Sequence, residues 1–167
     1  MIIGGQRQLS KSDLLWDEKV VDAYEIGQSV QSLRKRKPGV KIGLYCGDFQ
    51  ELTPADCVFL QLCRSSCDLF VVVIPTDYSL RLTDKIPRFS TDERAFRVGS
   101  LVSVQYISLF DEESCGLCID KVDPDYIFHG RTMNDQEVYS DILQKGKIQL
   151  IEYPWCSERT EGRFFSV

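Results

Sequence analysis

The residues best placed to do chemistry follow the first apolar run of the chain. Residues 40–46 are typical of a buried strand, Gly47 comes directly after them, and Thr53 has the character of a helix N-cap. A glycine turn between a strand and a helix directs backbone N–H groups and the positive end of the helix dipole toward a phosphate. We therefore expect Gly47, Asp48, Phe49 and Thr53 to contribute to a nucleotide-binding site.

Cations and one histidine could meet the same ligand from later parts of the chain, because loops that follow parallel strands gather at one edge of the sheet. The residues expected there are Asp77, Arg81, Lys85, Arg88, Arg94, His129, Gly130 and Arg131. Taken singly, each cation also fits a solvated surface charge. His129 follows an apolar strand, which favours ligand contact, but no partner nucleophile is identified for it, so hydrolysis is not supported.

Cys115 and Cys118 form a lone C-x-x-C motif. A zinc site needs four ligands, whereas this chain has one histidine and no second motif of this kind, so no metal site is predicted. Residues 111–118 instead fit a helix with the two cysteines one turn apart. The odd total of seven cysteines, with no secretory signal at residues 1–7, favours free packing thiols in a reducing cytoplasm.

Length and composition favour a single globular domain over residues 1–167. The content of 43% hydrophobic and 27% charged residues is typical of a folded soluble chain. A net charge of −5 argues against a nucleic-acid partner, because phosphate binding needs a basic surface. The basic run at residues 34–37 is expected at a helix end. No apolar run approaches the roughly 18 residues of a membrane span, so no membrane partner is expected.

Strands and helices alternate along residues 40–167, after an N-terminal strap and helix over residues 1–39. The continuous apolar run at residues 69–74 is typical of a strand buried on both faces of a parallel sheet. The expected strands are 40–46, 69–74, 104–110, 126–128 and 148–153, and the expected helices are 20–35, 111–118 and those begun by Thr53, Ser90 and Asn134. The pattern predicts an α/β fold, with a doubly wound five-stranded parallel sheet in the order 3-2-1-4-5. Residues 83–89 form the one sizeable irregular loop, at the ligand-binding edge.

The loop after the first strand resembles the signature of the cytidylyltransferase-like nucleotidyltransferases, G-x-F-D-x-L-H-x-G-H. Gly47, Phe49 and Leu52 match that signature. The differing positions are Gln50 for the aspartate, Thr53 and Asp56 for the two histidines, and Ala55 for the second glycine.

The resemblance covers about residues 20–160 and is to the nucleotidyltransferase domain of ADP-heptose synthases. Further similar segments are 69–77 (a strand and V-N-S-D turn), Arg81, 92–94 (E-R), 110–113 (F-D-E-D) and 124–130, where His129 replaces a lysine. The resemblance implies a Rossmann-like fold and a homodimer. It also implies a Mg–nucleoside triphosphate held by the first loop, and a sugar phosphate that attacks the α-phosphorus.

The departures from this family fall on its catalytic machinery, in which two histidines donate to phosphate oxygens. Thr53 offers one hydroxyl, and Asp56 is an anion where an anion must bind. Two like charges about 4 Å apart repel by roughly 4 kcal/mol at an effective dielectric of about 20. The same residues also make an ordinary helix start, with Thr53 as N-cap, Pro54 at N1 and Asp56 at N3.

Three functional hypotheses follow, in order of preference. The first is a nucleotidyltransferase-fold pseudoenzyme that regulates or joins a complex and binds a nucleotide or another phosphorylated small molecule. The second is an active adenylyl- or cytidylyltransferase for a sugar phosphate, in which Thr53, Asp56 and His129 would be the catalytic positions. The third is an α/β domain that binds an unrelated small ligand.

Overall fold

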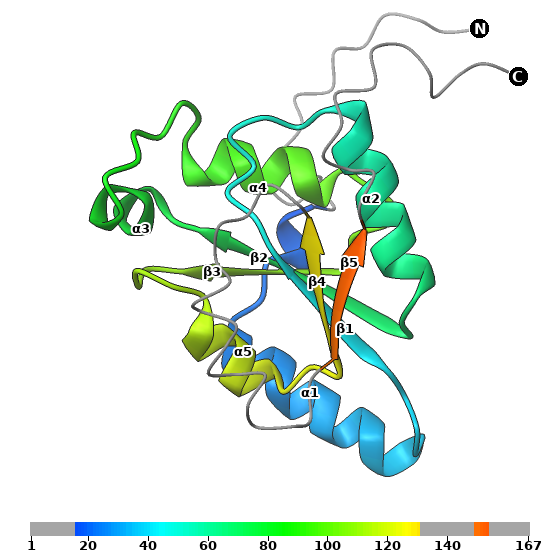
Figure 1. Ribbon diagram of the computed structural model, residues 1–167. Helices are drawn as coiled ribbons and strands as arrows, with labels where there is room; N and C mark the ends of the chain where they lie inside the picture. Colours follow the sequence, from blue (N-terminus) through cyan, green and yellow to red (C-terminus); the bar gives the residue numbers. More distant parts are fainter. Residues whose placement is uncertain (1–15, 131–148, 154–167) are drawn as a thin grey trace, which may run out of the picture.

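The computed structural model describes residues 16–130 and 149–153, which form a parallel sheet between two layers of helices (Figure 1). The strands are β1 (Ile42–Cys46), β2 (Leu69–Pro75), β3 (Tyr106–Phe110), β4 (Tyr126–Gly130) and β5 (Gln149–Tyr153). The helices are the 3₁₀ helix η2 (Asp17–Lys19), α1 (Ala23–Arg36), α2 (Pro54–Ser65), α3 (Asp77–Leu82), α4 (Thr91–Gly99) and α5 (Gly116–Val122). Helices α1 and α5 cover one face of the sheet, and α2 and α4 cover the other.

The strands lie in the order β3-β2-β1-β4-β5, and every neighbouring pair is parallel. Helix α2 follows β1 on one face of the sheet, whereas α5, which leads into β4, lies on the opposite face (Figure 1). The connection after β1 therefore begins at a topological switch point, where such folds bind ligands. The predicted α/β class and the parallel order 3-2-1-4 are confirmed.

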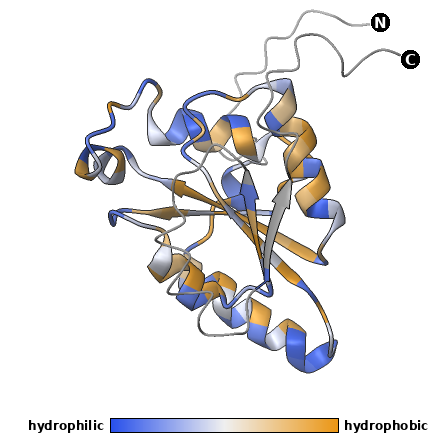
Figure 2. Cartoon of the chain, viewed as in Figure 1, coloured by the Kyte–Doolittle hydropathy of each residue, from blue (hydrophilic) through white to orange (hydrophobic). Residues whose placement is uncertain are grey.

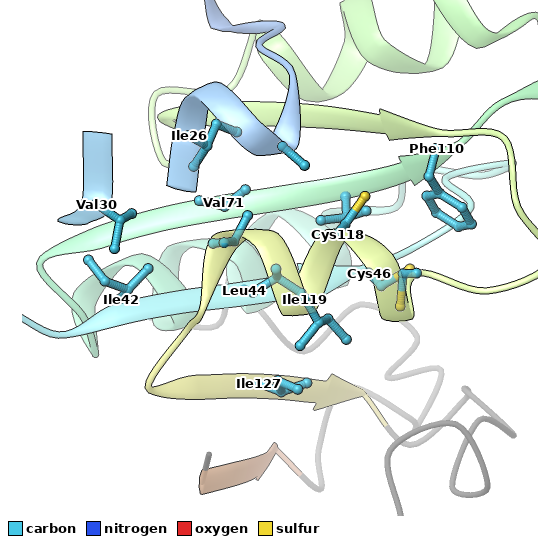
Figure 3. Close-up of a cluster of buried hydrophobic side chains, with 14 of the residues drawn as sticks. Ile26, Val30, Ile42, Leu44, Cys46, Val71, Phe110, Cys118, Ile119 and Ile127 are labelled. Atoms are coloured by element: carbon cyan, nitrogen blue, oxygen red, sulfur yellow. The ribbon is translucent and has the colours of Figure 1, made fainter. Parts of the chain in front are cut away.

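Apolar side chains fill both faces of the sheet. Along β2, Val71 and Val73 pack in the cluster under α1 and α5, whereas Val72 and Ile74 pack in the cluster under α2 and α4. The prediction of a strand buried on both faces is thus confirmed. Figure 3 shows the cluster under α1 and α5, in which side chains from both helices meet those of β1, β2, β3 and β4. Figure 2 shows hydrophobic residues concentrated in the central strands and a mixture of hydrophobic and hydrophilic residues along the helices.

The predicted strap contacts the body of the protein through Trp16. Its ring lies edge-on to Phe96 of α4, with 5.7 Å between the centroids. Lys19 Nζ donates to the carbonyl oxygens of Gly99 and Leu101 at 2.7 and 2.9 Å. The segment therefore closes over the C-terminal end of α4. Leu14 and Leu15, the two apolar residues just before Trp16, lie outside the described residues.

One helix was not predicted, and another begins at a different residue from the one expected. Helix α3 follows the predicted turn of residues 74–77, and Thr76 caps it by accepting from Ser79 N at 3.2 Å. Six residues are too few to show helical periodicity in the sequence. Helix α5 begins at Gly116 and not at residue 111, because Asp111 accepts from Thr76 Oγ1 at 2.6 Å and thereby joins the ends of β2 and β3. The helix predicted to begin at Asn134 lies outside the described residues.

Asp125 joins α1 to the starts of β1 and β4. Its Oδ2 accepts from Ile42 N at 2.9 Å and from Arg34 Nη2 at 3.0 Å. Arg34, the first residue of the basic run, thus has a carboxylate partner in addition to its place near the end of α1. Partial burial opposes ionisation of Asp125, but the hydrogen bonds from Ile42 and Arg34 outweigh it and hold the pKa of this carboxyl below its ordinary value.

We expect Asp125 to contribute stability that is lost in acid. A depressed folded-state pKa gives stabilisation that is complete above about pH 4 and disappears as the pH falls through the folded pKa. Asp125→Asn should therefore lower the free energy of unfolding at pH 7 by roughly 1 kcal/mol and flatten its decline toward pH 3. Urea titrations between pH 3 and pH 7 measure the free energy of unfolding and its dependence on pH. Asp123→Asn is the matched control, because Asp123 pairs with the same Arg34 but is mostly exposed; equal flattening in the two variants would contradict the assignment.

Candidate functional site

The connection from β1 to α2, residues 47–53, contains the signature loop. Gly47 N donates to Val73 O at 3.1 Å, and a Cβ at Gly47 would lie 3.0 Å from ring atoms of both Tyr45 and Phe49. Phe49 has a φ of 50°, in the left-handed region, and its ring lies edge-on to Tyr45 at 5.9 Å. Phe49 was expected to contact nucleotide, but its side chain is buried in the cluster under α2 and α4. Its role is to hold the loop.

The start of α2 already contains an anion. Asp56 Oδ2 accepts from Thr53 N and from Thr53 Oγ1, each at 2.7 Å, and Asp56 N donates to Thr53 Oγ1 at 3.3 Å. This reciprocal capping box confirms the predicted helix start, with Pro54 in the first turn. Pro54 has no N–H and Cys57 N donates to Thr53 O, so at most the Ala55 amide of the first turn is left for an incoming phosphate.

Arg94 is the buried centre of this edge of the sheet. Its side chain is fully buried, which contradicts the interpretation of a solvated surface charge. The guanidinium donates to five acceptors: Phe89 O (3.1 Å), Asp48 O (3.0 Å), Pro75 O (2.7 Å), Asp77 Oδ1 (2.8 Å) and Thr91 Oγ1 (3.4 Å). A guanidinium has five N–H groups, so the protein itself uses its full donor capacity. Arg94 therefore joins the signature loop, the end of β2 and the start of α4.

Asp77, the first residue of α3, is also used within the protein. It accepts from Arg94 Nη2 and from Thr91 Oγ1 at 3.0 Å, and its own N–H donates to Thr91 Oγ1 at 2.9 Å. Burial opposes ionisation, but the hydrogen bonds from Arg94 and Thr91 outweigh it and hold the pKa of Asp77 below its ordinary value. The carboxylate is thus ionised at neutral pH, as the partner of the buried guanidinium.

Lys85 and Arg88 lie in the loop of residues 83–89 and face the signature loop. Lys85 Nζ is 3.5 Å from Asp48 Oδ2, and Arg88 Nη1 is 2.8 Å from Glu51 Oε1. Lys85 and Arg88 are the cations that were expected to contact a phosphate. Asp48 and Glu51 are carboxylates of the signature loop, which was expected to hold that phosphate. The structure brings together the two halves of the predicted site, but it pairs them with each other.

The remaining residues of the predicted site lie in separate parts of the structure. Arg81 is exposed on α3 and has no carboxylate within 4 Å among the described residues. His129 is buried near the end of β4, where it is in register with Glu152 of β5. Gly130 is the last residue of β4, and Arg131 lies outside the described residues. His129 thus lies at the C-terminal end of β4, the strand next to β1, on the same edge of the sheet as the signature loop.

The two thiols of the C-x-x-C motif pack in the interior. Cys115 and Cys118 are buried in the cluster under α1 and α5, as the packing interpretation predicted, and burial raises the pKa of the Cys118 thiol to about 11. Over residues 16–130 and 149–153, no three His, Cys, Asp or Glu side chains come together in a group that could hold a metal ion. Within the same residues, no helix is long and apolar enough to cross a bilayer.

The chain is an α/β domain with a parallel sheet, and its first loop keeps part of the nucleotidyltransferase signature. No protein-family model matches the chain. A crystal structure of the lipopolysaccharide core biosynthesis protein from Thermoplasma volcanium is similar, with a TM-score of 0.60, 24% identity, and coverage of 70% of this chain and 98% of that chain. Pantoate–beta-alanine ligase from Francisella tularensis has a TM-score of 0.51 and 12% identity, with coverage of 81% and 66%. These two likenesses establish the fold alone.

The sequence relatives are more specific. Bifunctional protein HldE of Wolinella succinogenes is 31% identical over 129 residues, which span 75% of this chain and 27% of that protein. HldE of Rhodospirillum rubrum is 31% identical over 130 residues, which span 76% of this chain and 26% of that protein. The chain thus covers about a quarter of these relatives. It is a homologue of part of HldE, an ADP-heptose synthase, and the resemblance to the cytidylyltransferase-like nucleotidyltransferases is confirmed.

Proposed function

We propose that this chain is a nucleotidyltransferase-like domain that binds a phosphorylated ligand without transferring a nucleotidyl group, and that it acts as a regulator or as a subunit of a complex. The observation that carries the proposal is the carboxylate of Asp56 at the start of α2. It accepts two hydrogen bonds from Thr53 at 2.7 Å, in the place where the related signature has donors to phosphate. The helix dipole at this position is therefore already compensated by an internal anion.

The chemistry of nucleotidyl transfer supports the same proposal. Such transfer depends on donors and cations that stabilise charge as it develops on the phosphate oxygens. Here the Thr53 hydroxyl donates to Asp56, Arg94 is fully engaged, and Lys85 and Arg88 face carboxylates. An incoming triphosphate would have to displace Asp48 and Glu51 before it could reach those cations. A ligand can bind by taking the place of these carboxylates. A site whose cations must first leave other partners is not preorganised to stabilise the transition state of nucleotidyl transfer.

The activity of the sequence relatives suggests the ligand class. HldE is an ADP-heptose synthase, so the proposed ligands are a Mg–nucleoside triphosphate and a phosphorylated sugar. The exposed side chains of Lys85 and Arg88 are the cations that remain within reach of such anions. Arg94 and Asp77 would support the site from below without contacting the ligand, because their hydrogen bonds are made within the protein.

We expect no pyrophosphate release when the purified protein is mixed with ATP or CTP, Mg²⁺ and a heptose phosphate. A thermal-shift measurement on the same mixtures should show stabilisation by the nucleotide, because binding to the folded state alone raises its stability. Turnover that is proportional to protein concentration and is abolished by Thr53→Ala would instead establish an active transferase with a rearranged site. Absence of both turnover and a thermal shift would favour an α/β domain for an unrelated ligand.

A further inference from the structure

The loop of residues 83–89 is connected to the signature loop at its middle and at its end. Besides the ion pairs of Lys85 with Asp48 and of Arg88 with Glu51, Arg88 N donates to Gln50 Oε1 at 2.9 Å. The contacts link residues 37 or 38 positions apart in the sequence. Three successive polar contacts thus run along the facing edges of the two loops.

The individual interactions that hold the loop of residues 83–89 differ in strength. At the C-terminal end of the loop, Arg94 donates to Phe89 O, and the Arg97 guanidinium lies 4.1 Å from the centre of the Phe89 ring while donating to Phe49 O at 2.8 Å. At the preceding residue, the side chains of Arg88 and its partner Glu51 are 68% and 66% exposed. The backbone at residue 89 is therefore fixed by the buried Arg94, whereas residues 85 and 88 are held by solvated ion pairs that salt can screen.

We propose that residues 83–89 form a latch, closed over the signature loop by the Lys85–Asp48 and Arg88–Glu51 pairs, which opens when an anionic ligand replaces those carboxylates. The proposal rests on the proposed function in one respect, since the site that the latch controls is the one assigned to the phosphorylated ligand. In the closed form the two cations are neutralised by the loop that would receive the phosphate. Closure of the latch and phosphate binding thus compete for the same two cationic side chains.

Amide hydrogen exchange at Arg88 measures the latch directly, because this N–H donates to Gln50 across the two loops. An exposed ion pair changes a local equilibrium by up to about fivefold. Glu51→Gln should therefore accelerate exchange at Arg88 about two- to fivefold, with the amide of Val72 in central β2 unchanged as the reference for global unfolding. Glu113→Gln removes the same charge from an exposed residue that has no cation within 4 Å among the described residues, and should leave exchange unchanged.

Exchanging the two charges tests the geometry. Glu51→Arg combined with Arg88→Glu restores the pair in reverse and should return exchange of residues 85–89 to within about twofold of the wild type. Raising NaCl from about 0.05 to about 0.5 M should accelerate exchange in the wild type more than in Glu51→Gln. The latch would be overturned if the amide exchange rate at Arg88 in Glu51→Gln equalled that of the wild type. It would also be overturned if the variant with reversed charges kept the faster exchange rate of Glu51→Gln.

Calorimetric titration with ATP–Mg²⁺ tests control of the site. Glu51→Gln should bind more tightly than Glu113→Gln by about the factor seen in exchange, because both variants lose one negative charge but only one opens the loop. Equal affinities would overturn the proposed control. If ATP–Mg²⁺ binds to none of the proteins, the proposed ligand is wrong, while the exchange data still decide whether the latch exists.

Discussion

Replacing Arg94 with methionine will lower the free energy of unfolding by about 3–5 kcal/mol, the range for breaking a buried ion pair by removing one partner. Methionine keeps much of the length of the side chain and its apolar contacts but removes every donor. The carbonyls of Asp48, Pro75 and Phe89 and the carboxylate of Asp77 would then each lose a hydrogen bond. Unpaired buried polar groups lose their hydration without compensation, so the losses accumulate.

Urea unfolding of Arg94→Met and Arg88→Met is the measurement. The two variants undergo the same chemical change in neighbouring segments, but the Arg88 side chain is 68% exposed and its single ion pair is solvated. We expect Arg88→Met to change stability by less than about 1 kcal/mol. Arg94→Lys should also be clearly destabilised, because an ammonium group cannot reproduce five donors in a planar fork. Similar stabilities for the two methionine variants would show that the Arg94 hydrogen bonds are not what holds this edge.

The parts of the fold that could be predicted from the sequence are those specified by local patterns. The apolar run of β2 indicates burial on both faces of the sheet. The capping boxes that begin at Thr53 and Ser90 each involve only four consecutive residues. Both caps are found where they were predicted. Helix α3 was missed because its six residues contain less than two turns, too short a stretch for an amphipathic period to be recognised.

The position of the candidate site in the fold could be predicted from the sequence, but the ion pairs and hydrogen bonds within the site could not. The switch point follows from the order of strands, and it places the signature loop and the later cations at one edge. The partners of Arg94, however, include the backbone carbonyls of Pro75 and Asp48, which are 19 and 46 residues away in the sequence. A backbone carbonyl is the same at every position, so nothing in the sequence marks these as its acceptors. The Arg88–Glu51 pair is equally non-local, and neither charge differs from an ordinary surface residue.

Asp56→Asn should strengthen nucleotide binding by about ten- to a hundredfold, which corresponds to removing roughly 1.4–2.8 kcal/mol of repulsion. The carboxylate accepts from Thr53 N and Thr53 Oγ1, and it lies at the positive end of the α2 dipole. Asparagine keeps one oxygen that can accept from Thr53 N, so the capping geometry can persist while the charge disappears. The change in the free energy of unfolding should stay within about 1 kcal/mol.

The second capping box of the chain supplies the matched control. Glu93 at α4 accepts from Ser90 N and Ser90 Oγ at 2.8 and 2.9 Å, the same arrangement as at α2 but at the start of a different helix, outside the signature loop itself. Glu93→Gln should weaken its helix start slightly and leave nucleotide affinity unchanged. Calorimetric titration of both variants and the wild type with ATP–Mg²⁺ separates the loss of a cap from the loss of an anion at the site. Equal affinities in all three proteins would mean that no phosphate approaches the start of α2, because a charge within about 4 Å of a bound triphosphate cannot be neutral in its effect.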